Sequence, residues 1–73
     1  MKKTIIAVYK KEIPVVHNGD LLMAVASAIE AELNCSICRI RDESRKLLVA
    51  TVEYADGWRL DVGIDVLSTR KVR

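Results

Sequence analysis

The sequence predicts a small α+β domain, a two-layer sandwich in which one helix packs on one face of an antiparallel sheet. Two observations support this prediction. Leu21–Leu33 has the pattern of a single amphipathic helix, and Asp56-Gly57 lies between two runs in which apolar and polar residues alternate. Extended runs also precede the helix, so the expected order is β(β)αβββ, with a sheet of four or five strands.

The chain of 73 residues is expected to form one domain, residues 1–73. A domain of this size buries only about 60% of the surface that its unfolded chain exposes, so its core is small. Hydrophobic residues make up 51% of the sequence and there is one Pro, which argues against disorder.

The first extended segments precede the helix. Residues 4–9 are rich in β-branched side chains and predict a strand, which the polar residues 10–12 interrupt. Residues 13–16 form a second short run, in which Pro14 favours a sheet edge. One bulged strand and a small hairpin both fit this pattern.

The helix is expected to begin after Asp20 and to end before Asn34. Asp20 can cap the free amides of the first turn, and Asn tolerates the left-handed conformation that ends many helices. Between these residues an apolar stripe recurs every four positions, at Leu21, Val25, Ile29 and Leu33.

Residues 36–41 predict the next strand, and residues 42–45 a polar connection. Strict alternation along this strand would place Cys38 and Ile40 on the face that the helix covers. The residues expected on the opposite, uncovered face are Ile37, Arg39 and Arg41.

The Asp56-Gly57 hairpin determines which of the following side chains share a face. A three-residue loop, residues 55–57, pairs apolar residues with each other across the two strands, whereas a two-residue loop would pair them with polar ones. We therefore expect Glu53 opposite Arg59 on the uncovered face, and Tyr54 beside Trp58 in the core. The other hairpin residues expected under the helix are Leu48, Val52, Leu60, Val62 and Ile64.

No motif in the sequence indicates an enzyme. Cys35-Ser36-Ile37-Cys38 is a CxxC pattern, but structural zinc needs four ligands, and redox pairs of this kind begin a helix rather than a strand. We expect buried, structural cysteines; a zinc ion shared between two copies is the alternative. His17 lacks a placed nucleophile and is expected to be a surface or capping residue. No cofactor, metal or catalytic residue is predicted.

No secretory signal is expected, because the apolar run at residues 5–8 is too short. No stretch reaches the length of a transmembrane helix, so no membrane partner is expected. Two cysteines without a secretory signal are typical of a reducing, cytoplasmic setting.

The uncovered sheet face is the predicted working surface. Arg39, Arg41 and Arg59 would surround an apolar centre of Ile37 and Val49, and desolvated arginines are frequent binding hot spots. We expect this face to contact a protein or nucleoprotein partner. The alternative is that the N-terminal segments, the C-terminal tail or a second copy covers it; a second copy would make the protein a homodimer.

A basic tail is expected at about residues 68–73. Its cations Arg70, Lys71 and Arg73 favour the alternative function of a small nucleic-acid-binding protein. Against this, the uncovered face carries no pair of aromatic residues on which bases could stack.

Several features together resemble small phage-encoded anti-CRISPR proteins. They are a helix followed by Cys35, the strand residues Arg39-Ile40, an apolar strand ending in Tyr54, and the run Asp56-Gly57-Trp58-Arg59. The resemblance implies a stoichiometric, non-enzymatic inhibitor that docks basic residues on a CRISPR surveillance complex and obstructs its nucleic-acid path. The residues that it implies for this role are Arg39, Arg41 and Arg59.

Overall fold

The structure is a computed structural model that describes residues 1–72 and contains five strands and one helix. In chain order these are β1 (Lys2–Val8), β2 (Lys11–His17), α1 (Leu21–Leu33), β3 (Ser36–Ser44), β4 (Leu47–Glu53) and β5 (Arg59–Lys71). All strand pairs are antiparallel, and the sheet order is β2-β1-β5-β4-β3. The predicted α+β class is confirmed, with two strands before the helix.

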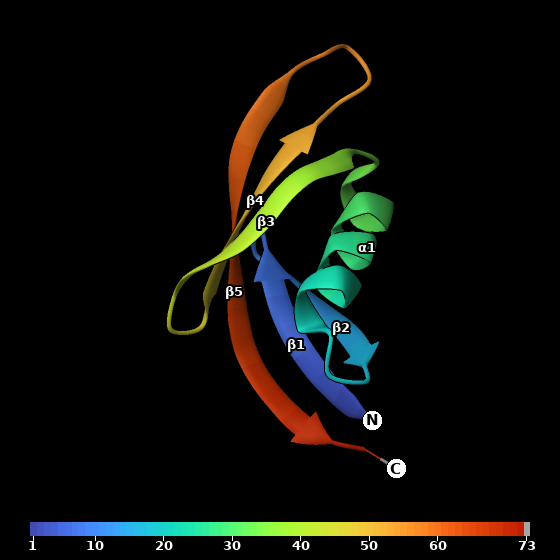
Figure 1. Cartoon of the computed structure of the whole chain (residues 1–73), viewed down its shortest axis with the longest axis vertical. Coiled ribbons are helices and arrows are strands. Elements are labelled where there is room, and N and C mark those ends of the chain that lie inside the picture. The colour runs from blue at the N-terminus through green and yellow to red at the C-terminus, as the bar shows by residue number, and fades with distance from the viewer. Residues whose placement is uncertain (73) are drawn as a thin grey trace.

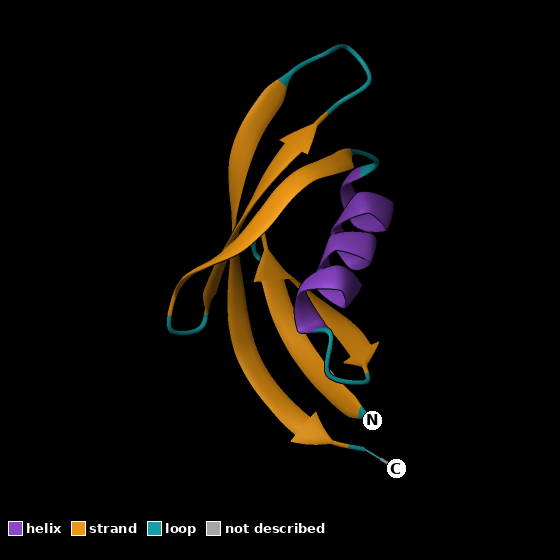
Figure 2. Cartoon of the chain, viewed as in Figure 1, coloured by secondary structure: helices purple, strands orange, loops and turns teal. Residues whose placement is uncertain are grey.

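The central strand β5 joins two hairpins. It pairs with β4 from Arg59 to Asp65 and with β1 from Asp65 to Lys71. The two hairpins are therefore staggered along β5, and the sheet curves around the helix (Figure 1). The helix lies on the concave face, and no element of residues 1–72 covers the opposite face, which we call the convex face (Figure 2).

β1 and β2 form a hairpin, which decides between the two possibilities that the sequence left open. Val8 pairs with Lys11, and the turn residues Tyr9 and Lys10 have φ values of 51° and 66°. Positive φ at both positions is typical of the type I′ turn that the twist of a hairpin favours. Pro14 lies in β2, at the sheet edge, as expected.

Helix α1 has the predicted bounds and both predicted caps. The Asp20 side chain accepts a hydrogen bond from the amide of Met23 at 3.2 Å. Asn34 is left-handed, with φ 54°, and its amide donates to the carbonyl of Glu30. Val25 and Ile29 are fully buried against the concave face. The remaining buried core residues are Ile6, Val8, Val15, Leu48, Ala50, Val52, Val62 and Ile64.

The predicted register of the β4–β5 hairpin is confirmed, since Glu53 pairs with Arg59. Tyr54 packs partly against the core, but 69% of the Trp58 surface is exposed, so the prediction of a buried Trp58 is wrong. Leu60 is also 37% exposed. The hairpin tip extends past the end of the helix, so no second layer reaches these side chains (Figure 1).

Strand β3 contains a bulge at Cys38, since Ile37 pairs with Val52 whereas Arg39 already pairs with Thr51. The extra residue shifts the alternation, so Ile37 packs against the core and Cys38 is exposed. The predictions of a buried Cys38 and of Ile37 on the uncovered face are therefore wrong.

The predicted basic tail is largely a strand. β5 passes a bulge near Leu67 and continues to Lys71 by pairing with β1. Arg70 and Lys71 therefore occupy fixed positions in the sheet, whereas Arg73 lies outside the described residues. β3 likewise extends to Ser44, beyond its predicted end.

Gly57→Ala is expected to lower the free energy of unfolding by about 1 kcal/mol, because a Cβ is disfavoured at the Gly57 φ of 87°. Urea denaturation measures this loss. Gly63→Ala is the matched control, since its added Cβ would meet only the Leu47 side chain, at 3.9 Å. Equal losses in the two variants would contradict a specific requirement for glycine in the loop.

Candidate functional site

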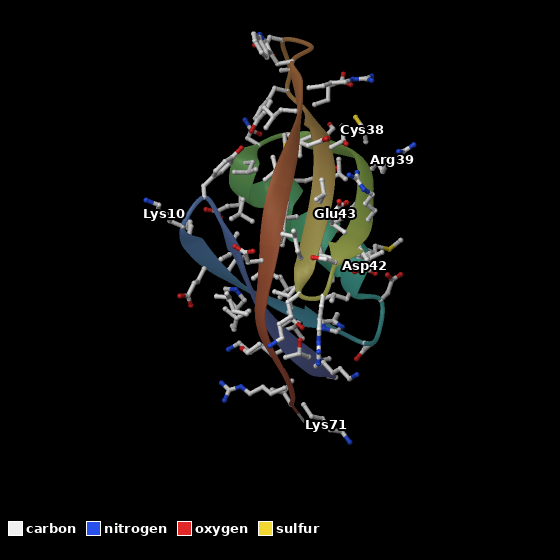
Figure 3. The ribbon with its side chains drawn as sticks, turned by 90° about the vertical axis from the view of Figure 1, so that its left-hand side faces the viewer. Lys10, Cys38, Arg39, Asp42, Glu43 and Lys71 are labelled. Carbon is white, nitrogen blue, oxygen red and sulfur yellow. The ribbon has the colours of Figure 1, made fainter. Side chains whose placement is uncertain are left out.

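The structure places all three predicted arginines on the convex face. Arg39 and Arg41 project from β3, and Arg59 projects from β5, on either side of β4. Figure 3 looks onto this face and shows Arg39 near one edge of the sheet, beside the exposed Cys38. The residues that β4 contributes between the arginines are Leu47, Val49, Thr51 and Glu53.

Carboxylates on the same part of the molecule match the charge of these arginines. Arg59 Nε donates to Glu53 Oε1 at 2.8 Å, and Arg41 Nε donates to Glu43 Oε2 at 3.1 Å. The Thr51 hydroxyl donates a hydrogen bond to Asp61 Oδ1 at 2.6 Å. Both ion pairs are solvent-exposed, so each contributes at most about 1 kcal/mol to stability. The patch is thus close to electrically neutral.

Arg39 differs from the other two arginines, because it forms no ion pair with any residue in the described part of the chain. It lies opposite Thr51, an uncharged residue. A carboxylate from a partner could therefore bind Arg39 without displacing an internal partner.

Aliphatic side chains lie on the convex face on both sides of β5. Leu47 and Val49 of β4 are half-buried, as are Ile5 and Ala7 of β1. Val16 of β2 is 53% exposed. The sequence predicted Val49 on this face but not the β1 and β2 residues, because it could not establish that residues 2–17 form a hairpin.

On the concave side, His17 belongs to a buried polar network rather than to the surface. The Gly19 amide donates to His17 Nδ1 at 3.3 Å, so the ring proton lies on Nε2, which donates to Thr4 Oγ1 at 2.9 Å. Thr4 Oγ1 in turn lies 2.9 Å from Thr69 Oγ1. Of the two expected roles, surface or capping, the structure shows the second: His17 is buried, and its Nδ1 caps the following turn. Both ring nitrogens are occupied in structural bonds.

Cys35 lines an open pocket together with Asn34, Ser36, Glu53, Tyr54 and Ala55. Burial, together with the nearby Glu30 carboxylate, raises the pKa of Cys35. The pKa of Tyr54 is also raised, mainly by burial and to a smaller extent by the nearby Tyr9 and Cys35. Both groups therefore stay protonated at neutral pH, and the Cys35 thiol is a poor nucleophile.

Within residues 1–72 no three His, Cys, Asp or Glu side chains are grouped so that they could hold a metal ion. The described part of the chain also has no helix with the length and apolar character needed to cross a bilayer. Comparison with protein-family models, with curated proteins and with solved structures finds no match for this chain.

Thr4→Val is expected to lower the free energy of unfolding by about 1–3 kcal/mol, because it leaves the buried His17 Nε2 proton without an acceptor. The measurement is denaturant unfolding. Thr51→Val is the matched control, since it removes a hydroxyl bond on the exposed convex face. Its loss should be smaller, and a loss as large as that of Thr4→Val would show that burial of the network is not the source of the effect.

Proposed function

We propose that this chain is a non-catalytic binding protein that docks on another protein through its convex face. The observation that supports this proposal is the composition of that face, where half-buried aliphatic residues lie beside charge-matched arginines and no element in the described part of the chain covers them. A monomer rarely leaves a large apolar patch exposed without a binding role.

The charge balance of the patch favours a protein partner over nucleic acid. Binding to a phosphate backbone depends on an excess of cations, whereas Glu43, Glu53 and Asp61 here offset the three arginines. A protein surface can instead supply groups of both signs around an apolar centre. Arg39 is the arginine best placed to act as an anchor, since it forms no ion pair within residues 1–72 that binding would have to break.

The resemblance to anti-CRISPR proteins supports a more specific form of the proposal. In that form docking is inhibitory and stoichiometric, and the partner is a protein surface of a CRISPR surveillance complex. Inhibition by occupancy needs no catalytic group in the chain, which is consistent with the protonated Cys35 and with the structural role of both His17 nitrogens.

The test compares two variants with the same change in charge and in apolar surface. Arg39→Glu with Val49→Glu alters the convex face, and the new carboxylate at position 49 lies opposite Arg41, so the sheet should tolerate it. Lys10→Glu with Met23→Glu is the control, at a turn and on the outer side of the helix, where Met23 is 67% exposed.

The wild type and the control variant are expected to retain one and the same protein, near equal stoichiometry, from nuclease-treated host lysate. The convex-face variant should bind that purified protein at least about tenfold more weakly, since a hot-spot residue is worth about 2 kcal/mol or more. Melting temperatures verify that both variants are folded. Equal binding by the two variants, or capture that nuclease abolishes, would contradict docking through this face.

A further inference from the structure

The end of the sheet that contains the N-terminus carries two pairs of like charges directly opposite each other. Lys2 pairs with Lys71, and Lys3 pairs with Arg70, in adjacent rows of the β1–β5 ladder. Like charges at directly opposed positions destabilise a sheet, so these four residues lower the stability of the fold in the absence of an anion.

Within residues 1–72 no carboxylate forms an ion pair with these cations. The β2 residues in the same two rows are His17 and Val16. We call this cluster the basic end; its residues are Lys2, Lys3, Arg70 and Lys71.

The charges of the basic end lie on both faces of the sheet. Thr4 and Thr69 face the concave side, where they bond to each other, so alternation places Lys2 and Lys71 on that side as well. Lys3 and Arg70 then lie on the convex side. The end of β5 and the N-terminus extend together beyond the helix, and Lys71 lies at the tip (Figures 1 and 3).

We propose that the basic end binds the phosphate backbone of duplex DNA. A flat anionic surface, such as a lipid bilayer or an acidic protein patch, would meet only one face of the strands. The major groove of B-form DNA is about 12 Å wide, admits a two-stranded β-ribbon, and has phosphates along both walls. β2 ends at His17, and the chain on either side of the β1–β5 ladder continues beyond it as a pair, since the Val72 amide donates to the Met1 carbonyl. Cations on both faces of this paired end match that arrangement, and they lie at the opposite end of β5 from Arg59 and the charge-matched patch proposed for protein docking.

Charge reversal at Arg70 is expected to weaken DNA binding without lowering the stability of the fold. Arg70→Glu would place a carboxylate opposite Lys3, so a repulsive cross-strand pair becomes an attractive one. The melting temperature should stay the same or rise. Affinity for duplex DNA should fall, so a loss of binding could not be attributed to unfolding. Lys10→Glu is the control, because it makes the same change of charge in the β1–β2 turn at the other end of β1.

The experiment measures fluorescence anisotropy of a labelled DNA duplex over a series of KCl concentrations. The expected result is salt-dependent binding by the wild type and the Lys10→Glu variant. Arg70→Glu should lower the affinity at low salt about tenfold and reduce the slope of log affinity against log salt by about 1, the contribution of one phosphate contact.

Three results would overturn the proposal. The first is no binding of the duplex by the wild type at low salt. The second is an equal loss of affinity in the Arg70→Glu and Lys10→Glu variants, which would show that binding depends on the net charge of the protein and not on the basic end. The third is tighter binding of the single strand of the same sequence, or of phosphatidylserine vesicles, than of the duplex. The convex-face variant, Arg39→Glu with Val49→Glu, should bind the duplex as the wild type does, so failure here is distinguishable from failure of protein docking.

Discussion

β5 pairs with a different hairpin along each of its halves, and the shape of every exposed surface depends on that division. The first half of β5 pairs with β4, and its second half pairs with β1. Among the described residues of β5, Asp65 alone pairs with both neighbouring strands, with Ala7 of β1 on one side and Leu47 of β4 on the other. Ile64 and Val66 flank Asp65 and pack with the core beneath the helix. Without β5 the two hairpins would share no strand pairing, so the concave surface that Val25 and Ile29 fill would not exist.

The stagger around β5 also explains why the molecule exposes so much surface for its size. One helix of 13 residues, about 20 Å long, covers the middle of a molecule that measures 40 Å along its longest axis. The β4–β5 tip and the basic end therefore project beyond it in opposite directions (Figure 1). The convex face remains uncovered because residues 1–72 contain no second helix. The two proposed binding surfaces are thus regions that the single covering layer cannot reach.

The features that the sequence predicted are those set by local patterns. Asp20, Asn34 and the four-residue apolar period determine the helix, and the loop at Gly57 with alternation on both sides determines the register of β4 with β5.

Other features depend on partners distant in the chain. The polar end of β5 is a strand because β1 lies beside it, and the bulge at Cys38 adds a residue without any mark in the hydrophobic pattern. The β1–β2 turn uses Tyr9 and Lys10 rather than the usual glycine or asparagine. The arginines of the candidate site were predictable from alternation, whereas their internal carboxylate partners and the exposure of Trp58 required the three-dimensional arrangement.

Native-state hydrogen exchange of backbone amides, followed over a range of denaturant concentrations, tests most directly whether β5 unites the two hairpins. The structure predicts that the ladder amides of β1 and of β4 that bond to β5 exchange with the same free energy of opening, equal to that of global unfolding. A lower free energy for β1 and β2, with β3 and β4 still protected, would show that the hairpins open as separate units and that β5 does not couple them.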